Sequence, residues 1–210
     1  MIRTLITLIM FIQCISGIQG QNKAPKTFNL SLKNKKQWHF EGIGEWEMKD
    51  STLIIVKNAI TDKPFRVPSA RAIYTAKKYG NFELSASIKS NASTEQIRGD
   101  IILIFGYQSP SQFYYAHFTG TVDDTHNGIF IVNNTDRKKL MDNNTSPFLP
   151  DRDWHNVRLT RNIKTGEIKV FVDGSVNPSL ELTDKTFLKG NIGVGSFNDP
   201  GEIKDIVVIK

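Results

Sequence analysis

The stretch from Trp154 to Gly174 constrains the fold more than any other part of the chain. Apolar and polar residues alternate on both sides of a turn-rich loop over 162–166. Successive side chains of a strand point to opposite faces, so this pattern predicts two antiparallel strands with one buried face. Such a hairpin is not stable alone and must belong to a larger sheet that packs on another apolar layer. The residues predicted to face that layer are Val157, Leu159, Ile168, Val170 and Val172.

Short alternating segments recur along most of the chain. They include candidate strands over 70–76 and 82–88, a second hairpin over 100–118, a strand over 128–133 and two final strands around 198–201. After the first twenty residues no segment shows a sustained period of 3.6, as a helix would. About a dozen short strands separated by turns predict an all-β fold, either a sandwich or a barrel.

The first twenty residues have the pattern of a secretory signal peptide. Arg3 precedes an apolar run over 5–12, small residues follow, and polar residues begin at Gln21. We expect cleavage after Gly20, which leaves 21–210 as a single secreted or periplasmic domain. The alternative is an uncleaved membrane anchor, although the run is short for a spanning helix, which needs about 20 apolar residues.

The single cysteine and the net charge limit the remaining possibilities. Cys14 lies inside the leader, so the mature domain would contain no disulfide; the other interpretation, lipidation of Cys14, requires a small residue where Gln13 stands. Lys and Arg outnumber Asp and Glu by 27 to 21, a net charge of +6. This excess is compatible with acidic glycans or a cell surface. The interleaving of basic and aromatic residues that is typical of nucleic-acid modules does not occur.

Several segments together carry a resemblance to a known fold family. They are the W-x-M-x-D-x-x-L of residues 46–53, FGYQSPSQFYYAHF, WHNVRLTR, GEIKVFVDG and GNIGVGSFNDPGEIKDIVV. Their order is similar to the concanavalin A-like lectins and glucanases, which include laminin-G domains. Within that group the chain most resembles secreted bacterial single-domain proteins described as 3-keto-disaccharide hydrolase-like or family-16-like. The resemblance implies an all-β jelly-roll sandwich of two antiparallel sheets, one concave and one convex.

The resemblance also bears on metal binding and catalysis. It implies a structural calcium ion where the last strand meets the first, with Asp205 at the acidic position; the alternative is a plain surface aspartate. A family-16 glucanase would carry an E-x-D-x-x-E strand, which places its carboxylates on one face. This motif is absent, since the nearest stretch, Glu41 to Glu47, departs from it and is expected to be exposed.

The hairpin over 100–118 is the best candidate for a binding surface. A turn over 108–112 predicts the cross-strand pairs Tyr107 with Phe113, Phe105 with Tyr115 and Leu103 with His117. Tyr107, Phe113, Tyr115 and His117 then form one stripe, with Ile102 and Ile104 on the opposite, core-facing side. We expect the stripe on the open concave face, where aromatic rings stack against sugars. The alternative is that both faces are buried and the stripe is part of the core.

A polar loop over 119–127 follows the stripe. Its Asp123, Asp124 and His126 can ligate a divalent ion, activate water or hydrogen-bond a sugar, although the same residues are also ordinary turn formers. Arg98 and Asp100, at the start of the hairpin, form either a site pair or an ion pair at the sheet edge. The candidate catalytic residues are His117, His126 and Asp124. The candidate ligand-binding residues are Tyr107, Phe113, Tyr115, Arg98, Asp123 and Arg158.

Three functions remain open from the sequence. The first is a carbohydrate-recognition domain that holds a saccharide on its concave face. The second is a glycoside hydrolase or lyase that uses His117, His126 and a carboxylate. The third is a structural or adhesion module. Clustering of the titratable residues with Arg158 around one cleft would favour the enzyme, whereas an aromatic groove without titratable groups would favour binding.

Overall fold

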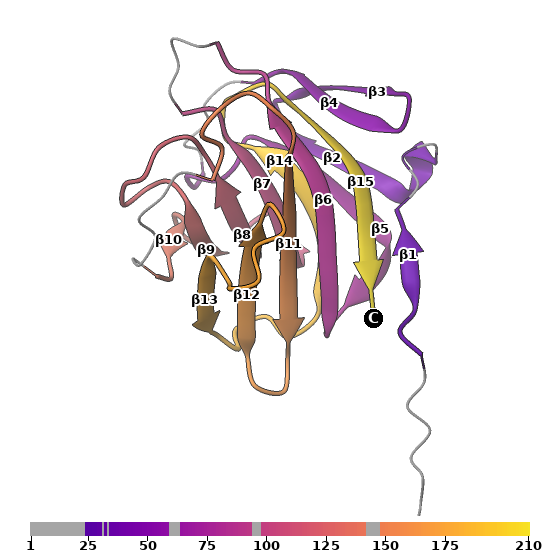
Figure 1. The fold of residues 1–210 in the computed structure, drawn as a ribbon, viewed down its shortest axis with the longest axis vertical. Helices are drawn as coiled ribbons and strands as arrows, with labels where there is room; N and C mark the ends of the chain where they lie inside the picture. Colours follow the sequence, from indigo (N-terminus) through magenta and orange to yellow (C-terminus); the bar gives the residue numbers. More distant parts are fainter. Residues whose placement is uncertain (1–23, 31, 33, 59–63, 94–97, 142–147) are drawn as a thin grey trace, which may run out of the picture.

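The computed structural model describes residues 24–30, 32, 34–58, 64–93, 98–141 and 148–210. Figure 1 shows an all-β protein with one short 3-10 helix in the described part of the chain. The elements in chain order are β1 (Thr27–Asn29), η1 (Lys35–Gln37), β2 (Trp38–Gly42), β3 (Glu45–Lys49), β4 (Thr52–Lys57), β5 (Ala70–Tyr79), β6 (Phe82–Ser90), β7 (Ile101–Ser109), β8 (Gln112–Phe118), β9 (Gly128–Asn133), β10 (Lys138–Lys139), β11 (His155–Asn162), β12 (Glu167–Val172), β13 (Leu180–Thr183), β14 (Gly190–Ser196) and β15 (Gly201–Ile209).

The strands form two antiparallel sheets, which confirms the predicted sandwich. Sheet A has the order β13-β12-β11-β6-β15-β4-β3, and β1 pairs with β15 outside this path. Sheet B has the order β10-β9-β8-β7-β14-β5-β2. In Figure 1, β6, β11 and β12 of sheet A lie in front of β7 and β8 of sheet B. Some neighbours in each sheet, such as β6 with β15 and β5 with β14, come from distant parts of the sequence, so segments far apart in the chain pack into the same core.

The hairpin predicted from Trp154 to Gly174 is confirmed as β11 and β12. Its register pairs Val157 with Val172, Leu159 with Val170 and Arg161 with Ile168. Gly166 closes the connecting loop at φ +89°, a left-handed conformation that only glycine adopts without strain, and its N–H donates to the Asn162 carbonyl at 2.8 Å. Alternation therefore identified both the strands and their partners correctly.

The core between the sheets contains the residues that this alternation points inward. Leu159, Ile168 and Val170 are fully buried, and Val172 packs on the same cluster. The strand β6 contributes the predicted face of Phe82, Leu84, Ala86 and Ile88, all buried. Removal of this much apolar surface from water is the main source of stability for a domain of this size.

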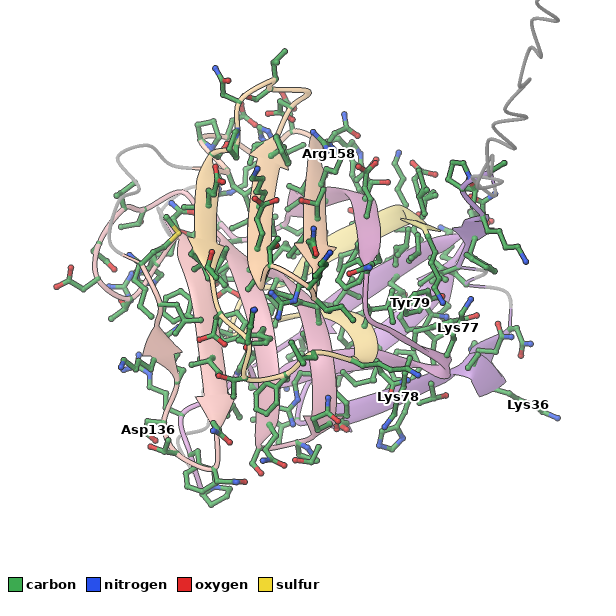
Figure 2. All side chains as sticks on the ribbon, turned by 90° about the horizontal axis from the view of Figure 1, so that it is seen from below. Lys36, Lys77, Lys78, Tyr79, Asp136 and Arg158 are labelled. Atoms are coloured by element: carbon green, nitrogen blue, oxygen red, sulfur yellow. The ribbon has the colours of Figure 1, made fainter. Side chains whose placement is uncertain are left out.

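A second apolar cluster lies on the other side of sheet B, away from sheet A. Ile102, Ile104, Tyr115 and Phe130 belong to it. The segment 64–69 and the turn around Phe197 cover it, and the Arg66 N–H donates to Asp136 Oδ1 at 2.9 Å, which joins the first of these segments to the connection between β9 and β10. Figure 2, an edge-on view, shows Asp136 on this side of the sandwich and Arg158 on the opposite side.

Part of the prediction about the leader lies outside the described residues. The signal peptide over 1–20, its cleavage site and Cys14 all fall in the segment 1–23. Across the residues that the structure describes, no helix has the length and apolar character needed to cross a membrane.

Candidate functional site

The predicted stripe lies on a single face of sheet B, but its register differs from the prediction. The structure pairs Phe105 with Tyr114, Ile104 with Tyr115 and Ile102 with His117. Phe105 and Leu103 therefore face the inter-sheet core, whereas Ile102 and Ile104 share the face of the stripe. The cause is a bulge in β7, where residues 106–108 lie opposite the single residue Phe113 of β8, next to a tight turn at Pro110 and Ser111; Gly106 in this bulge has a φ of +59°.

The expectation that the stripe lies on an open face is wrong. Tyr107 is 8% exposed, and the side chains of Phe113, Tyr115 and His117 are almost completely buried. The Tyr115 ring stacks on Phe130 with centroids 5.0 Å apart, and its hydroxyl accepts a hydrogen bond from Arg137 Nη1 at 3.3 Å. Burial raises the pKa of Tyr115 above its ordinary value despite the nearby guanidinium. Alternation identifies a shared face but carries no information about the loops that cover it.

His117 occupies the most unusual position in this covered region. It is 1% exposed, and neither ring nitrogen has a hydrogen-bond partner among the described residues. Its ring lies 5.7 Å from that of His126 and 5.5 Å from that of Phe197, measured between centroids. Burial lowers its pKa well below the ordinary value, and Arg137 and His126 add to the effect. His117 is therefore a neutral, desolvated imidazole, which is a costly state unless other contacts compensate for it.

A buried carboxyl group, that of Asp100, lies beside His117. Asp100 Oδ1 is 4.0 Å from His117 Nε2 and accepts a hydrogen bond from the Ser196 hydroxyl at 2.8 Å. The backbone N–H of Asp100 donates to Asp199 Oδ2 at 3.0 Å. Burial raises the pKa of Asp100 to about 7, and the charge of Asp199 contributes to the rise, although hydrogen bonds from Phe197 and Ser196 oppose the shift. Asp100 therefore keeps its proton to a higher pH than an exposed aspartate does.

The predicted pairing of Asp100 with Arg98 at the sheet edge is wrong. Asp100 is buried and bonded to the turn around Phe197, whereas Arg98 is exposed. The Arg98 carbonyl instead accepts a hydrogen bond from the Gly120 N–H at 2.7 Å, which fixes the start of the polar loop. Arg98 lies close enough to His126 to contribute to the lowering of its pKa.

The polar loop folds around its own hydrogen bonds. His126 Nδ1 lies 2.7 Å and 2.8 Å from the two oxygens of Asp123, and the Thr125 N–H and hydroxyl donate to the same carboxylate. These hydrogen bonds outweigh partial burial and lower the pKa of Asp123; burial lowers that of His126 despite the carboxylate. Asp124 is exposed. The loop brings His126 and Asp123 to His117, but Asp124 is not brought into this contact.

Metal binding is not supported by these side chains. In the described part of the chain, no group of three or more His, Cys, Asp or Glu residues could hold a metal ion. At Asp205 the carboxylate accepts a hydrogen bond from the Ser87 hydroxyl at 3.3 Å. Calcium takes six to eight oxygen ligands. Asp205 is the one carboxylate that the described residues place there, and the calcium ion that the resemblance implied stays a prediction.

Arg158 does not join the other predicted residues. It lies on β11 in sheet A, where its Nη1 is 3.1 Å from Glu83 Oε2 and its guanidinium lies 3.7 Å from the centroid of the Phe171 ring. His117 pairs with Ile102 and packs against Tyr115 on the outer face of sheet B, so the whole sandwich separates the two residues. The sequence therefore identified parts of two different surfaces and assigned them to one site.

An open cavity on this side of sheet B lies at the tip of the β7–β8 hairpin. We call it the hairpin pocket; it measures about 450 Å³ and lies between this tip, the end of β2 and the segment 64–71. Its apolar lining includes Ile43, Phe65 and Pro110, and Ile43 is 55% exposed. Its polar lining includes Ser69, Arg71, Ser109 and Ser111.

An ion pair lies at the base of the hairpin pocket. Arg71 Nε and Nη2 each lie 3.1 Å from Glu41 Oε2, and both side chains are less than a tenth exposed. Glu41 Oε1 also accepts a hydrogen bond from the Tyr107 hydroxyl, and Arg71 Nη1 donates to the Pro68 carbonyl. Arg71 lies opposite Gly195 of β14, which has no side chain to crowd it. The network neutralises the Arg71 charge and still leaves some of its five N–H donors for a ligand.

Neither Glu41 nor Arg71 was predicted to be a site residue. Glu41 was expected on an exposed strand, and Arg71 lies in a candidate strand without any pattern that distinguishes it. The two residues become neighbours only because β2 pairs with β5, in a register that places Glu41 opposite Arg71. A sequence separation of 30 residues gives no local signal for such a contact.

Comparisons with known proteins show the fold of this chain but not its function. The carbohydrate binding module CBM66 from Bacillus subtilis aligns at a TM-score of 0.62 with 13% identity, over 81% of this chain and 93% of that one. A basic winged bean lectin with Tn-antigen aligns at a TM-score of 0.58 with 16% identity, over 88% of this chain and 97% of the lectin. Winged bean acidic lectin complexed with methyl-alpha-D-galactose aligns at a TM-score of 0.56 with 15% identity, over 88% of this chain and 98% of the lectin. These likenesses confirm the concanavalin A-like sandwich.

Sequence comparisons identify no family for this chain. No family model matches the chain. No curated protein matches it either. The assignment to a concanavalin A-like fold therefore depends on the arrangement of strands, and any function has to be argued from the surface of this molecule.

Proposed function

We propose that the protein is a carbohydrate-binding module that holds a neutral saccharide, without cleaving it, in the hairpin pocket. The observation that carries the proposal is the cavity of about 450 Å³ at the tip of the β7–β8 hairpin, with apolar walls and an ion pair at its base. Ligand sites are concave and mostly apolar, with a few fixed polar groups, and span about 300–1,000 Å³.

The chemistry of the lining suits a sugar ring. The C–H faces of a pyranose or furanose need an apolar surface, which Phe65, Ile43 and Pro110 offer. Sugar hydroxyls need donors and acceptors, which Ser109 and the remaining N–H groups of Arg71 supply. Because Glu41 balances the charge of Arg71, the pocket should prefer neutral saccharides to charged ones. The sandwich that carries it is also the fold of the carbohydrate-binding proteins named above.

Binding is favoured over hydrolysis by the position of the acid and base groups. Glycoside hydrolysis uses two carboxyl groups on either side of the scissile bond. Among the described residues that line the pocket there is no carboxylate, and Glu41 beneath it is engaged by Arg71. His117 and Asp100, which have shifted pKa values, are buried under the turn around Phe197. A hydrolase or lyase acting on a 3-keto-disaccharide or similar glycan is the alternative that the assay must exclude.

The test is a glycan array on the mature chain, combined with a reducing-sugar assay on every glycan that binds. We expect binding to neutral saccharides with no release of reducing ends. Phe65→Ala removes an apolar wall that is only partly buried, so binding should weaken about tenfold while the fold persists. Val176→Ala, at a side chain that is 91% exposed, is the control and should bind like the wild type. Release of reducing ends, or equal affinity of Phe65→Ala and wild type, would contradict the proposal.

A further inference from the structure

A second hollow lies on the outer face of sheet A, on the opposite side of the sandwich from the hairpin pocket. It measures about 440 Å³ and is lined by residues from β6, β11, β12 and β15. Its polar lining includes Ser85, Ser87, Asn156 and Asp205, and its apolar lining includes Phe171 and Val207. Arg158 and Asp205, which the sequence assigned to different sites, both line it.

The hollow exists because small residues are surrounded by large ones. Ser85 and Ser87 face outward from the middle of β6, where a long side chain would fill the space. On one side Arg158 lies over the Phe171 ring and forms a wall. On the other side β15 has a register shift between Lys204 and Val207, and Asp205 adopts a φ of +52°. This irregularity places the Asp205 carboxylate beside Ser87 at the rim of the hollow.

Most of the charges on this face are paired, but that of Asp205 is not. Arg158 pairs with Glu83 at 3.1 Å, Lys89 with Glu202 at 3.8 Å, and Lys169 with Glu167 and Glu181 at 3.1 Å and 3.2 Å. Lys204 Nζ lies 4.0 Å from the centroid of the Trp154 ring. Among the described residues no cation is paired with Asp205. The hollow therefore carries one negative charge for which this part of the protein supplies no counterpart.

The hydrogen bonds on the floor of the hollow leave some acceptor oxygens without a donor. The Ser87 hydroxyl lies 3.1 Å from Asn156 Oδ1 and 3.3 Å from Asp205 Oδ2. A hydroxyl has a single hydrogen, so it can donate to only one of the two oxygens at a time. Whichever of Asn156 Oδ1 and Asp205 Oδ2 does not accept this hydrogen is available to a donor of a ligand, and so is the second carboxylate oxygen of Asp205. A ligand that fits must bring several donors, one of them positively charged.

We infer that this hollow is a second binding site, and that it takes a small polyhydroxylated ligand with a protonated amine, namely an amino sugar. The ammonium group pairs with Asp205, and the hydroxyls bond to Asn156, Ser85 and Ser87. The apolar edge of the ring lies against Phe171 and Val207. This inference does not depend on the proposed function, because the two cavities lie on opposite faces and share no residue.

The test is isothermal titration of the full mature chain with glucosamine and, separately, with glucose, at about pH 6, where the amine carries a proton. Glucosamine should bind at least about tenfold more tightly than glucose, since a charge-assisted hydrogen bond is stronger than a neutral one. Asp205→Asn keeps the shape, and asparagine tolerates positive φ, so the fold should persist. It should abolish the preference for glucosamine.

The matched control is Glu202→Gln, a carboxylate on the same strand that is already paired with Lys89. It should retain the full preference. Ser85→Phe fills the hollow without removing charge and should abolish glucosamine binding, so the inference remains testable if Asp205→Asn is poorly folded. Backbone amide shifts induced by glucosamine should centre on Ser87, Asn156 and Gly174.

Equal affinities for glucosamine and glucose in the wild type would overturn the inference. So would an unchanged preference in Asp205→Asn, or amide shifts centred on Ile43 and Ser109, because glucosamine would then occupy the hairpin pocket. Failure of the hairpin pocket to bind any neutral saccharide would refute the proposed function and would leave this inference unaffected.

Discussion

Replacement of Asp100 by asparagine tests how the buried polar groups of sheet B are ionised. In the folded protein, burial raises the pKa of Asp100 from 3.8 to about 7. As pH rises from about 4 to 7, the unfolded chain loses this proton and the folded chain keeps it. The folded state then binds more protons, so the free energy of unfolding falls with rising pH. Asparagine has no proton to lose and should remove this dependence.

The size of the effect follows from the shift. The pKa of Asp100 differs by about three units between the unfolded and folded states. At about 1.4 kcal/mol per unit, this difference changes the free energy of unfolding by at most about 4 kcal/mol. The side-chain oxygen that Asp100→Asn retains can still accept from the Ser196 hydroxyl and from the Phe197 N–H, so the local hydrogen bonds persist. The stability of Asp100→Asn relative to the wild type should therefore rise by up to about 4 kcal/mol between about pH 4 and pH 7.5.

Urea denaturation of both proteins at several pH values measures this difference, with equal m-values as the check on a two-state comparison. Asp124→Asn is the control, because Asp124 is exposed and its replacement should change stability by less than about 0.5 kcal/mol. A difference between Asp100→Asn and wild type that stays constant with pH would refute the reasoning. A difference that falls with pH would mean that Asp100 is charged in the fold and is stabilised there.

The core, the covered stripe, His155 and the leader can each be tested in the same way. Leu159→Ala should cost about 2–5 kcal/mol of unfolding free energy, and an unchanged Tm would contradict the placement of this residue in the core. Tyr115→Ala should cost about 3–5 kcal/mol with saccharide affinity of the folded fraction unchanged; a lower affinity would return Tyr115 to the binding site. His155 Nδ1 lies 2.8 Å from Asp173 Oδ2, and its Nε2 lies 2.9 Å from Asp151 Oδ1. Burial lowers the pKa of His155, but these hydrogen bonds outweigh burial and raise it. The stabilisation is therefore present below about pH 6.5 and is lost as pH rises through the folded pKa, a loss that His155→Gln should not show in urea denaturation. Mass spectrometry of protein exported by a bacterial host should find a new N-terminus near Gln21, and an intact Met1 or a lipid on Cys14 would contradict export with cleavage.

The sequence was sufficient for the fold wherever a strand has one strictly alternating face. In β11 and β12 each second residue is apolar, and a shift by one residue would expose the whole set to water, so only one register is stable. The same argument holds for β6. In β7 it failed at Gly106, because a bulge changes the phase of the alternation and a glycine within a strand does not reveal its φ.

The candidate site was predicted less well, for a different physical reason. Alternation correctly placed Tyr107, Phe113, Tyr115 and His117 on one face, and the polar loop does bring His126 to His117. Whether that face is open depends on segments that come from elsewhere in the chain, such as the turn around Phe197. The network of Glu41 and Arg71 likewise exists only through the pairing of β2 with β5. Neither contact can be predicted from the periodicity of the sequence.

The central claim is that a saccharide binds in the hairpin pocket, and amide chemical-shift mapping tests it most directly. Isotope-labelled protein would be titrated with the neutral saccharide that binds most tightly on the array. We expect saturable shifts centred on Gly42, Ile43, Ser109 and Ser111, which line the pocket, and none of comparable size around Asn156 on sheet A. Shifts centred on any other surface, or no saturable shift with any neutral saccharide, would contradict it.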